Sequence, residues 1–376
     1  MKPVWDIFCA VVDNFGDIGV CWRLARQLER EHGVAARLWV DDLASFARIC
    51  PDVAPESREQ MVQGVEVLHW AEPLPARQPG DVVIEAFACE LPAGFVEAMA
   101  ARGVPPLWIN LEYLSAEPWV RDCHAMVSRH PRLPLTKYFF FPGFEAGTGG
   151  LLCEGDLERA RAGFDHAARQ AFLARLGVPA LMAGELCVSL FSYANPALDA
   201  LFDAWRHSPR PVRALIPEGR AAERLAARFG APSQAGDCWR LGALTAHILP
   251  FVEQPDYDRL LWCCDINFVR GEDSFVRAQW AGRPFVWHIY PQEDDAHRAK
   301  LDAFLALYCA ALPAGQAETV RRMWHAWNGD GEVDHAWPAF ATLDTELARH
   351  GEGWAASLRT LGDLAGNLAR FSQSRL

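Results

Sequence analysis

Residues 11–30 read VVDNFGDIGVCWRLARQLER, and this stretch decides the predicted fold. It overlaps the end of an apolar run at 7–12, which is typical of a strand buried on both faces of a parallel sheet. A polar turn follows at 13–19, and from Val20 onward apolar residues recur at the spacing of a helix. Another apolar run lies at 36–40. The order strand, turn, helix, strand predicts the start of an alternating α/β layer.

The same alternation continues along the chain. Short apolar runs predict further strands of a first domain at 65–68, 81–87 and 106–110. A second series of predicted strands lies at 186–191, 212–217, 247–251, 265–269 and 284–290. We therefore predict two doubly wound α/β halves, with ligands beyond the carboxyl ends of the strands.

The chain has 376 residues, which at roughly 100–200 residues per domain indicates two domains. We predict a first domain at residues 1–150, which ends in the glycine-rich stretch at 147–150. A linker is predicted at 151–183 and a second domain at 184–354. The last helix, at about 355–376, is expected to pack back on the first domain. Its helically spaced apolar residues begin just before it: Trp354, Leu358, Leu361, Leu364, Leu368 and Phe371.

Composition excludes several classes of partner. The formal net charge is −12, which argues against duplex nucleic acid and anionic membranes, since both require a basic face. No apolar run approaches the roughly 18 residues of a membrane span. The 11 cysteines are odd in number and form no CxxC pair, so we expect reduced thiols in a cytoplasmic protein.

Two aspartates mark the junction between the first predicted strand and its helix. Asp17 could be a helix N-cap, and Asp13 could bond a backbone N–H at the strand end. Two carboxylates at one junction make a chemical role an equal alternative. The glycine spacing permits close approach of another molecule to the backbone. The loop candidates are Asn14, Phe15, Gly16 and Gly19.

A second candidate lies at 268–284, where a strand, a glycine turn, a helix and a glycine follow in order. Unpaired N–H groups at a helix N-terminus suit a diphosphate, and Arg270 could add a cation beside it. Glu272 has the wrong sign for phosphate, so we expect it to bind a sugar hydroxyl. The alternative is ordinary helix capping by Glu272, Asp273 and Ser274.

Aromatic residues follow two other predicted strands. Phe191 and Tyr193 follow the strand at 186–191, and Phe251 and Gln254 follow the one at 247–251. Aromatic faces and an amide can sandwich and read a pyrimidine, although core packing is the alternative for each ring. The DxD triplet at 256–258 opens a helical run, so we interpret it as capping and predict no metal site.

These stretches resemble the bacterial family of protein-arginine rhamnosyltransferases, the EarP family, which acts on elongation factor P. The similar segments are DNFGDIGVCWRLARQL, INLEYLSAEPWV, RLPLTKYFFFPGF, RGEDSFVRAQWAGRPFVWHIYPQ and DDAHRAKLDAF. The resemblance implies a GT-B fold, with two Rossmann-like domains facing across a cleft. It implies inverting, metal-independent transfer of rhamnose from dTDP-β-L-rhamnose to an arginine of elongation factor P, without a cofactor. The modified factor would then support translation of polyproline stretches.

The resemblance also implies residue roles. Asp17 is the expected general base, with Asp13 as its companion, and Glu272 is a further catalytic candidate. The donor site is expected to contain Phe191, Tyr193, Phe251, Gln254, Arg270, Glu272, Asp273 and Ser274. Two rival functions are a nucleotide-sugar epimerase of the same architecture, which needs no protein acceptor, and a non-catalytic nucleotide-binding module, which shows no turnover.

Overall fold

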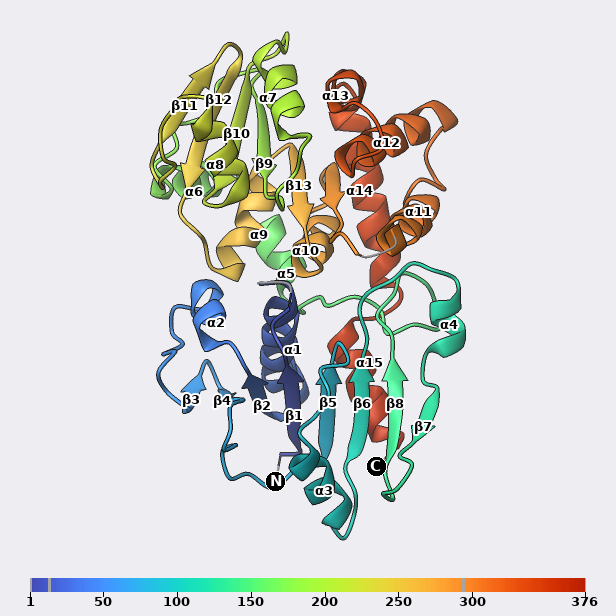
Figure 1. The fold of residues 1–376 in the computed structure, drawn as a ribbon. Coiled ribbons are helices and arrows are strands. Elements are labelled where there is room, and N and C mark those ends of the chain that lie inside the picture. Colours follow the sequence, from blue (N-terminus) through green and yellow to red (C-terminus); the bar gives the residue numbers. More distant parts are fainter. Residues whose placement is uncertain (1, 13–14, 293–294, 376) are drawn as a thin grey trace. The chain divides into compact units, whose positions relative to one another are not determined.

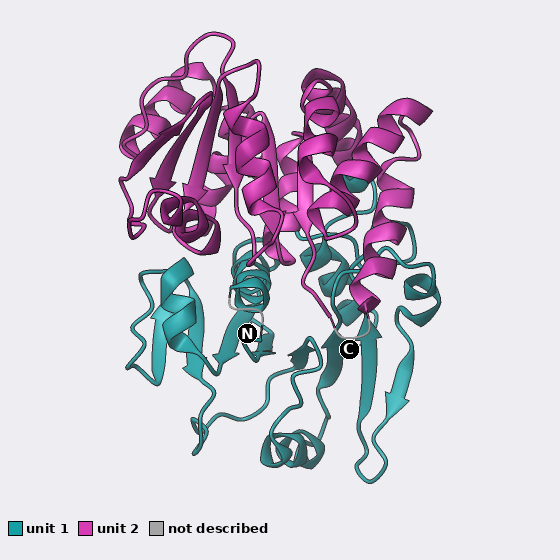
Figure 2. Cartoon of the chain, turned by 45° about the horizontal axis from the view of Figure 1, so that its top comes forward, with its two compact units in different colours: residues 1–155, 358–376 teal, residues 156–357 magenta. Residues whose placement is uncertain are grey.

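The computed structural model describes residues 2–12, 15–292 and 295–375 (Figure 1). Asp13 and Asn14, both predicted site residues, lie outside the described residues. The chain forms two compact units, coloured separately in Figure 2. Unit 1 contains Met1–Gly155 and Leu358–Leu376, and unit 2 contains Asp156–Ser357.

Within the described residues, unit 1 is built on an eight-stranded sheet with the order β3-β4-β2-β1-β5-β6-β8-β7. The six inner strands are parallel, and the edge strands β3 and β7 are antiparallel. The strands are β1 (Val4–Cys9), β2 (Ala35–Val40), β3 (Glu59–Val62), β4 (Val65–His69), β5 (Val82–Ala86), β6 (Leu107–Leu111), β7 (Val127–Arg129) and β8 (Thr136–Phe140). The helices are α1 (Gly16–His32), α2 (Leu43–Ile49), α3 (Ala93–Ala101), α4 (Trp119–Cys123) and α15 (Leu364–Gln373).

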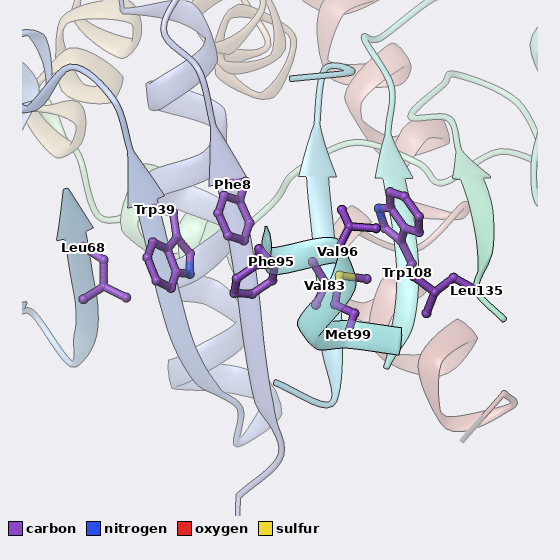
Figure 3. Packing of buried hydrophobic residues seen from close by; sticks show 9 residues of the cluster. All are labelled: Phe8, Trp39, Leu68, Val83, Phe95, Val96, Met99, Trp108 and Leu135. Carbon is purple, nitrogen blue, oxygen red and sulfur yellow. The ribbon is translucent and has the colours of Figure 1, made fainter. Parts of the chain in front are cut away.

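An aromatic core lies between α3 and the sheet of unit 1 (Figure 3). The rings of Phe8 on β1 and Trp39 on β2 stack with centroids 5.0 Å apart, and Phe95 of α3 meets both rings edge-on. Each such pair adds about 0.5–1.5 kcal/mol to the free energy gained from apolar burial. These contacts hold β1, β2 and α3 together.

A buried aspartate anchors the amino end of β1. Asp6 is fully buried, and its carboxylate accepts hydrogen bonds from the Arg37 guanidinium at 2.6 Å, the Gly80 N–H at 2.7 Å and the Trp39 indole at 2.8 Å. A buried charge of this kind is tolerated because it is paired and hydrogen-bonded. Gly80 permits the close approach, since a Cβ there would lie 2.4 Å from the Val4 carbonyl oxygen.

Unit 2 is built on a six-stranded sheet in the described residues, with the order β11-β12-β10-β9-β13-β14. Only β11 of these strands runs antiparallel to its neighbour. The strands are β9 (Leu186–Leu190), β10 (Val212–Pro217), β11 (Cys238–Leu241), β12 (Leu244–Leu249), β13 (Ile266–Arg270) and β14 (Phe285–His288). The helices are α5 (Leu157–Ala162), α6 (His166–Arg175), α7 (Leu198–Arg206), α8 (Arg220–Ala227), α9 (Gln254–Cys263), α10 (Asp273–Ala281), α11 (Ala296–Tyr308), α12 (Ala314–Trp327), α13 (Val333–Ala341) and α14 (Asp344–Arg359).

The first strand and helix differ from their predicted bounds. β1 is Val4–Cys9 rather than 7–12, because its pairing with β2 runs from Val4 to Cys9, and Val12 is 70% exposed. The helix α1 begins at Gly16, so Gly16 and Gly19 lie in its first turn instead of in a tight turn before it. Apolar character alone extended the predicted strand, whereas hydrogen-bonded pairing with β2 defines the real one.

The predicted last helix is in fact two helices. The chain breaks between α14 and α15, where Gly362 has a φ of +74° and Asp363 caps α15 by accepting a hydrogen bond from the Gly366 N–H at 2.9 Å. Trp354 on α14 belongs to unit 2, where its indole donates to Gln279 Oε1 at 2.8 Å. The apolar residues that predict one helix therefore span two helices, and they pack in both units.

α15 brings the end of the chain into unit 1. The ring of Phe371 meets the rings of Tyr138 and Phe140 on β8, and the Gln27 amide of α1 donates to Asp363 Oδ1 at 3.0 Å. The stretch 151–183, expected to be a linker, contains α5 and α6 of unit 2.

Replacing Asp363 by alanine tests the attachment of α15. We expect Asp363→Ala to cost about 0.5–2 kcal/mol, since a helix cap is lost, and to speed amide hydrogen exchange in α15. The matched control is Asp165→Ala, which removes the equivalent cap of α6, where Asp165 accepts from the Ala168 N–H. That variant should speed exchange in α6 alone. Unchanged exchange across α15 in Asp363→Ala would contradict the role of this cap.

Candidate functional site

The sheet of unit 2 has a point where the chain changes direction (Figure 1). β10 and β12 lie on one side of β9, and β13 and β14 lie on the other. In open α/β sheets, ligands bind beyond the carboxyl ends of the strands at such a switch point. Phe191 and Tyr193 follow β9, and Arg270 is the last residue of β13. Three residues predicted from separate sequence segments thus meet at this edge.

Arg270 lies between two aromatic rings. Its guanidinium carbon is 4.5 Å from the centroid of the Phe191 ring and 4.6 Å from that of Tyr193, and the residue is only 8% exposed. Cation–π contacts of this kind strengthen when water is excluded. In this structure the two rings hold a guanidinium, and stacking of a pyrimidine on them stays a prediction.

The turn into α10 places a helix N-terminus beside Arg270. Gly271 adopts a left-handed φ of +63°, which favours glycine, and the Ser274 hydroxyl donates to the Arg270 carbonyl oxygen. Glu272 occupies the N-cap position and Asp273 begins the helix. The first N–H groups of a helix and its dipole favour an anion at this end.

The start of α9 approaches the same turn. Gln254 is buried, and its amide donates to Asp273 Oδ2 at 3.4 Å. The ring of Phe251 lies edge-on to Phe191, with centroids 6.5 Å apart. All the residues predicted for the donor site therefore belong to one edge of unit 2.

The structure adds two residues that the sequence did not indicate. Tyr257 of α9 meets the Phe191 ring at 5.9 Å, and burial raises the pKa of its phenol. His288 ends β14 directly opposite Arg270 and meets the Tyr193 ring at 5.3 Å. Burial and the Arg270 cation lower the pKa of His288 to about 4. The predicted strand ends at residue 290, so the prediction does not mark His288 as a strand end. The sequence interpretation treats Tyr257 only as part of a capping triplet.

A buried ion pair fixes α10 against α9. The guanidinium of Arg277 donates to both oxygens of Asp258, at 2.7 and 2.8 Å, and both side chains are almost fully buried. The Trp287 indole also donates to the Gly271 carbonyl oxygen at 2.9 Å. These bonds hold the helix N-terminus in a defined position.

The acidic triplet at 256–258 is occupied by ion pairs, since Asp256 accepts from Arg175 at 2.8 Å and from Arg259 at 2.7 Å. Among the described residues, the one group with ligand atoms close enough for a metal ion is formed by Glu332, Asp334 and His335, all exposed. Exposed acidic clusters are common without an ion, so these three side chains carry no metal assignment.

In unit 1, Asp17 lies in the first turn of α1 at the carboxyl end of the sheet. It is 2% exposed, and its Oδ2 accepts a hydrogen bond from the Val12 N–H at 2.9 Å. Asp17 therefore closes the loop before the helix, and Phe15 occupies the N-cap position that was one alternative for Asp17. The Phe15 ring is 5.9 Å from the Arg48 guanidinium carbon.

The loops after β5 and β6 reach the same edge of unit 1. Phe87, Ala88 and Glu90 have φ values of 58°, 54° and 50°, a region that side chains other than glycine rarely adopt. The Phe87 ring stacks on Tyr113 at 4.5 Å. Such strained positions concentrate at functional sites, and no periodicity in the sequence marks them.

Comparison with known proteins identifies relatives over the whole chain. The family model described as Elongation-Factor P (EF-P) rhamnosyltransferase EarP matches residues 5–373. A Pseudomonas putida protein named protein-arginine rhamnosyltransferase is 52% identical over 379 residues, covering 100% of both chains.

Two solved structures are also similar. One, reported as the structural basis for EarP-mediated arginine glycosylation of translation elongation factor EF-P, is 40% identical, with a TM-score of 0.72 and full coverage of both chains. The glycosyltransferase VinC, solved in complex with dTDP, has a TM-score of 0.52 at 13% identity, covering 99% of this chain and 100% of its own, and shows a shared fold alone. The predicted GT-B fold class is confirmed. No helix in the described stretches of the chain is both long and apolar enough to cross a membrane.

The Asp258–Arg277 pair generates a stability prediction. We expect Arg277→Met to destabilise unit 2 by about 3–5 kcal/mol, because it leaves a buried carboxylate without its partner. The matched control is Arg259→Met, which breaks an exposed pair with Asp256 and should cost at most about 0.5 kcal/mol. Urea unfolding measures both values. Equal unfolding midpoints for the two variants would contradict a larger effect of the buried pair on the free energy of unfolding.

Proposed function

The chain belongs to the EarP family of elongation-factor P rhamnosyltransferases, and on that basis we propose that it moves L-rhamnose from dTDP-β-L-rhamnose to one arginine of elongation factor P. Membership of the family makes the chain a glycosyltransferase. The proposed reaction inverts the anomeric centre, uses neither a metal ion nor a cofactor, and prepares the factor for translation of polyproline stretches. We place it in the cytoplasm, where thiols stay reduced, in agreement with eleven cysteines that form no CxxC pair.

One observation gives the main support for the proposed binding of the donor. Arg270 and the N-terminus of α10 lie together at the switch point of the unit 2 sheet. In the proposed complex, the two phosphates of the donor bind there, and Phe251 and Gln254 contact the thymine. In the proposal, Arg270 and the helix N-terminus also stabilise the diphosphate as it leaves, which is the task a metal ion performs in other transferases.

The acceptor half requires a carboxylate. A guanidinium has a pKa above about 12 and a delocalised lone pair, so it is a poor nucleophile until a base holds it and takes its proton. We propose Asp17 as that base, assisted by Asp13. The nitrogen attacks the anomeric carbon as the bond to the diphosphate oxygen breaks, and the guanidinium proton passes to Asp17. Glu272 is proposed to bind a rhamnose hydroxyl.

Low exposure of Asp17 favours this role electrostatically. A charge in a site from which water is excluded attracts a cation more strongly than an exposed charge does. In the proposal, unit 1 receives the acceptor and unit 2 the donor, and exclusion of water from the reacting groups prevents hydrolysis of the donor.

Intact-mass analysis tests the proposed reaction directly. The protein is incubated with elongation factor P and dTDP-β-L-rhamnose, with and without a chelator. We expect the factor to gain the mass of one rhamnosyl residue in both samples, located on an arginine by peptide mapping. Conversion of the nucleotide sugar without modification of the factor would indicate an epimerase instead. Binding without any turnover would indicate a non-catalytic module.

Asp17→Asn tests the proposed role of Asp17 as a base separately from its hydrogen bond with the Val12 N–H. An asparagine side chain can still accept from the Val12 N–H, so the loop and dTDP affinity should be retained. Transfer should fall at least about 100-fold, because an amide cannot take the proton. Asp17→Ala, which loses both features, should also reduce thermal stability. Turnover of Asp17→Asn at the normal rate would refute the assignment.

A further inference from the structure

His288 is a buried polar residue at the candidate donor site to which the proposed reaction assigns no role. It is 6% exposed, and its Nδ1 is closed off from solvent without a hydrogen-bond partner among residues 2–12, 15–292 and 295–375. Buried polar atoms in native proteins are almost always hydrogen-bonded, so an orphan at a ligand site calls for an explanation.

The position of His288 links it to the binding edge. It ends β14 in register with Arg270, the last residue of β13, and its ring packs edge-on against Tyr193 at 5.3 Å and Trp327 at 5.8 Å. Tyr193 in turn contacts the Arg270 guanidinium. The Tyr193 ring therefore contacts both a permanent cation and an imidazole.

Burial, together with the neighbouring positive groups, keeps His288 neutral in the free protein. Arg270 on β13 and His297 on α11 act on it electrostatically, while Tyr193 and Trp327 present uncharged rings. Burial is the larger cause of its lowered pKa of about 4, and the Arg270 cation adds to it. A neutral imidazole beside a cation is the lower-energy state as long as no anion is present.

An anion beside Arg270 reverses this balance. A diphosphate carries at least two negative charges, so it offsets the Arg270 cation and adds a negative potential at the imidazole. Both effects favour the protonated ring, which can then donate from both nitrogens. The pKa of His288 would rise toward or above its ordinary value of about 6.5.

We propose that His288 is a further binding residue of the donor site, and that its imidazole takes up one proton from solvent when a nucleoside diphosphate binds beside Arg270. This inference rests on the donor site of the proposed function. The proton returns to solvent when the diphosphate product leaves, so the cycle is balanced without another reactant.

Calorimetric titration with dTDP tests the proposal. Heats are measured at pH 6 and pH 8 in two buffers of different ionisation enthalpy, which gives the number of protons taken up. The outer phosphate of dTDP has its own pKa of about 6. The informative quantity is therefore the difference in proton uptake between the native protein and His288→Gln. The native protein should take up a larger fraction of a proton at pH 6 than the variant does.

The variant should also bind dTDP roughly tenfold more weakly at pH 6 than the native protein, a difference that shrinks at pH 8. His288→Asn, whose amide nitrogen lies near the position of Nδ1, should lose the proton uptake as well. His297→Gln and His350→Gln are matched controls. The first removes the neighbouring imidazole, the second removes a half-buried one bonded to the Tyr308 carbonyl, and both should keep the uptake.

A measurement on the native protein removes any dependence on how the variants fold. With the histidine rings labelled with carbon-13, dTDP at pH 6 should move the His288 signal to its protonated position. Equal proton uptake in the native protein and in His288→Gln, or an unshifted ring signal with dTDP bound, would overturn the inference alone. Failure of the native protein to bind dTDP would overturn the proposed donor as well.

Discussion

Parallel pairing of the strands sets where the candidate site residues of this molecule lie. Neighbouring inner strands in each unit are parallel, so the loops that leave their carboxyl ends share one edge of the sheet. In each unit the chain also reverses its direction of growth at one point, between β1 and β5 and between β9 and β13. In open α/β sheets, such points are where ligands bind, beyond the carboxyl ends of the strands. Asp17 and Arg270 follow or end strands at these two points.

Buried contacts fix the turn between β13 and α10 in unit 2. The Asp258–Arg277 pair joins α9 to α10, and the Trp287 indole holds the Gly271 carbonyl oxygen. Charges buried in this way add little net stability compared with apolar residues, but they fix the relative position of two helices. The same arrangement desolvates Arg270 between two rings. An anion arriving at this edge therefore meets groups that are already oriented, which lowers the cost of reorganisation.

The sequence predicts the donor-site candidates because they lie at or just after the ends of predicted strands. Phe191, Arg270 and Gln254 follow or end apolar runs, and a parallel sheet necessarily brings such positions together. The same reasoning missed His288, since the apolar run around it continues beyond the last paired residue. It also joined α14 and α15 into one helix, because helical spacing passes through Gly362 without interruption while the backbone does not.

From the amino-acid sequence one can predict the α/β class, the approximate order of strands and helices and the segments that contain the candidate site residues. These properties depend on local periodicity and on turn residues, which are written in neighbouring positions. The folded structure alone shows that Asp258 pairs with Arg277 and that Arg270 lies between Phe191 and Tyr193. The physical reason is that burial, ion pairing and ring packing join residues far apart in the chain, and no local pattern encodes which side chains will meet.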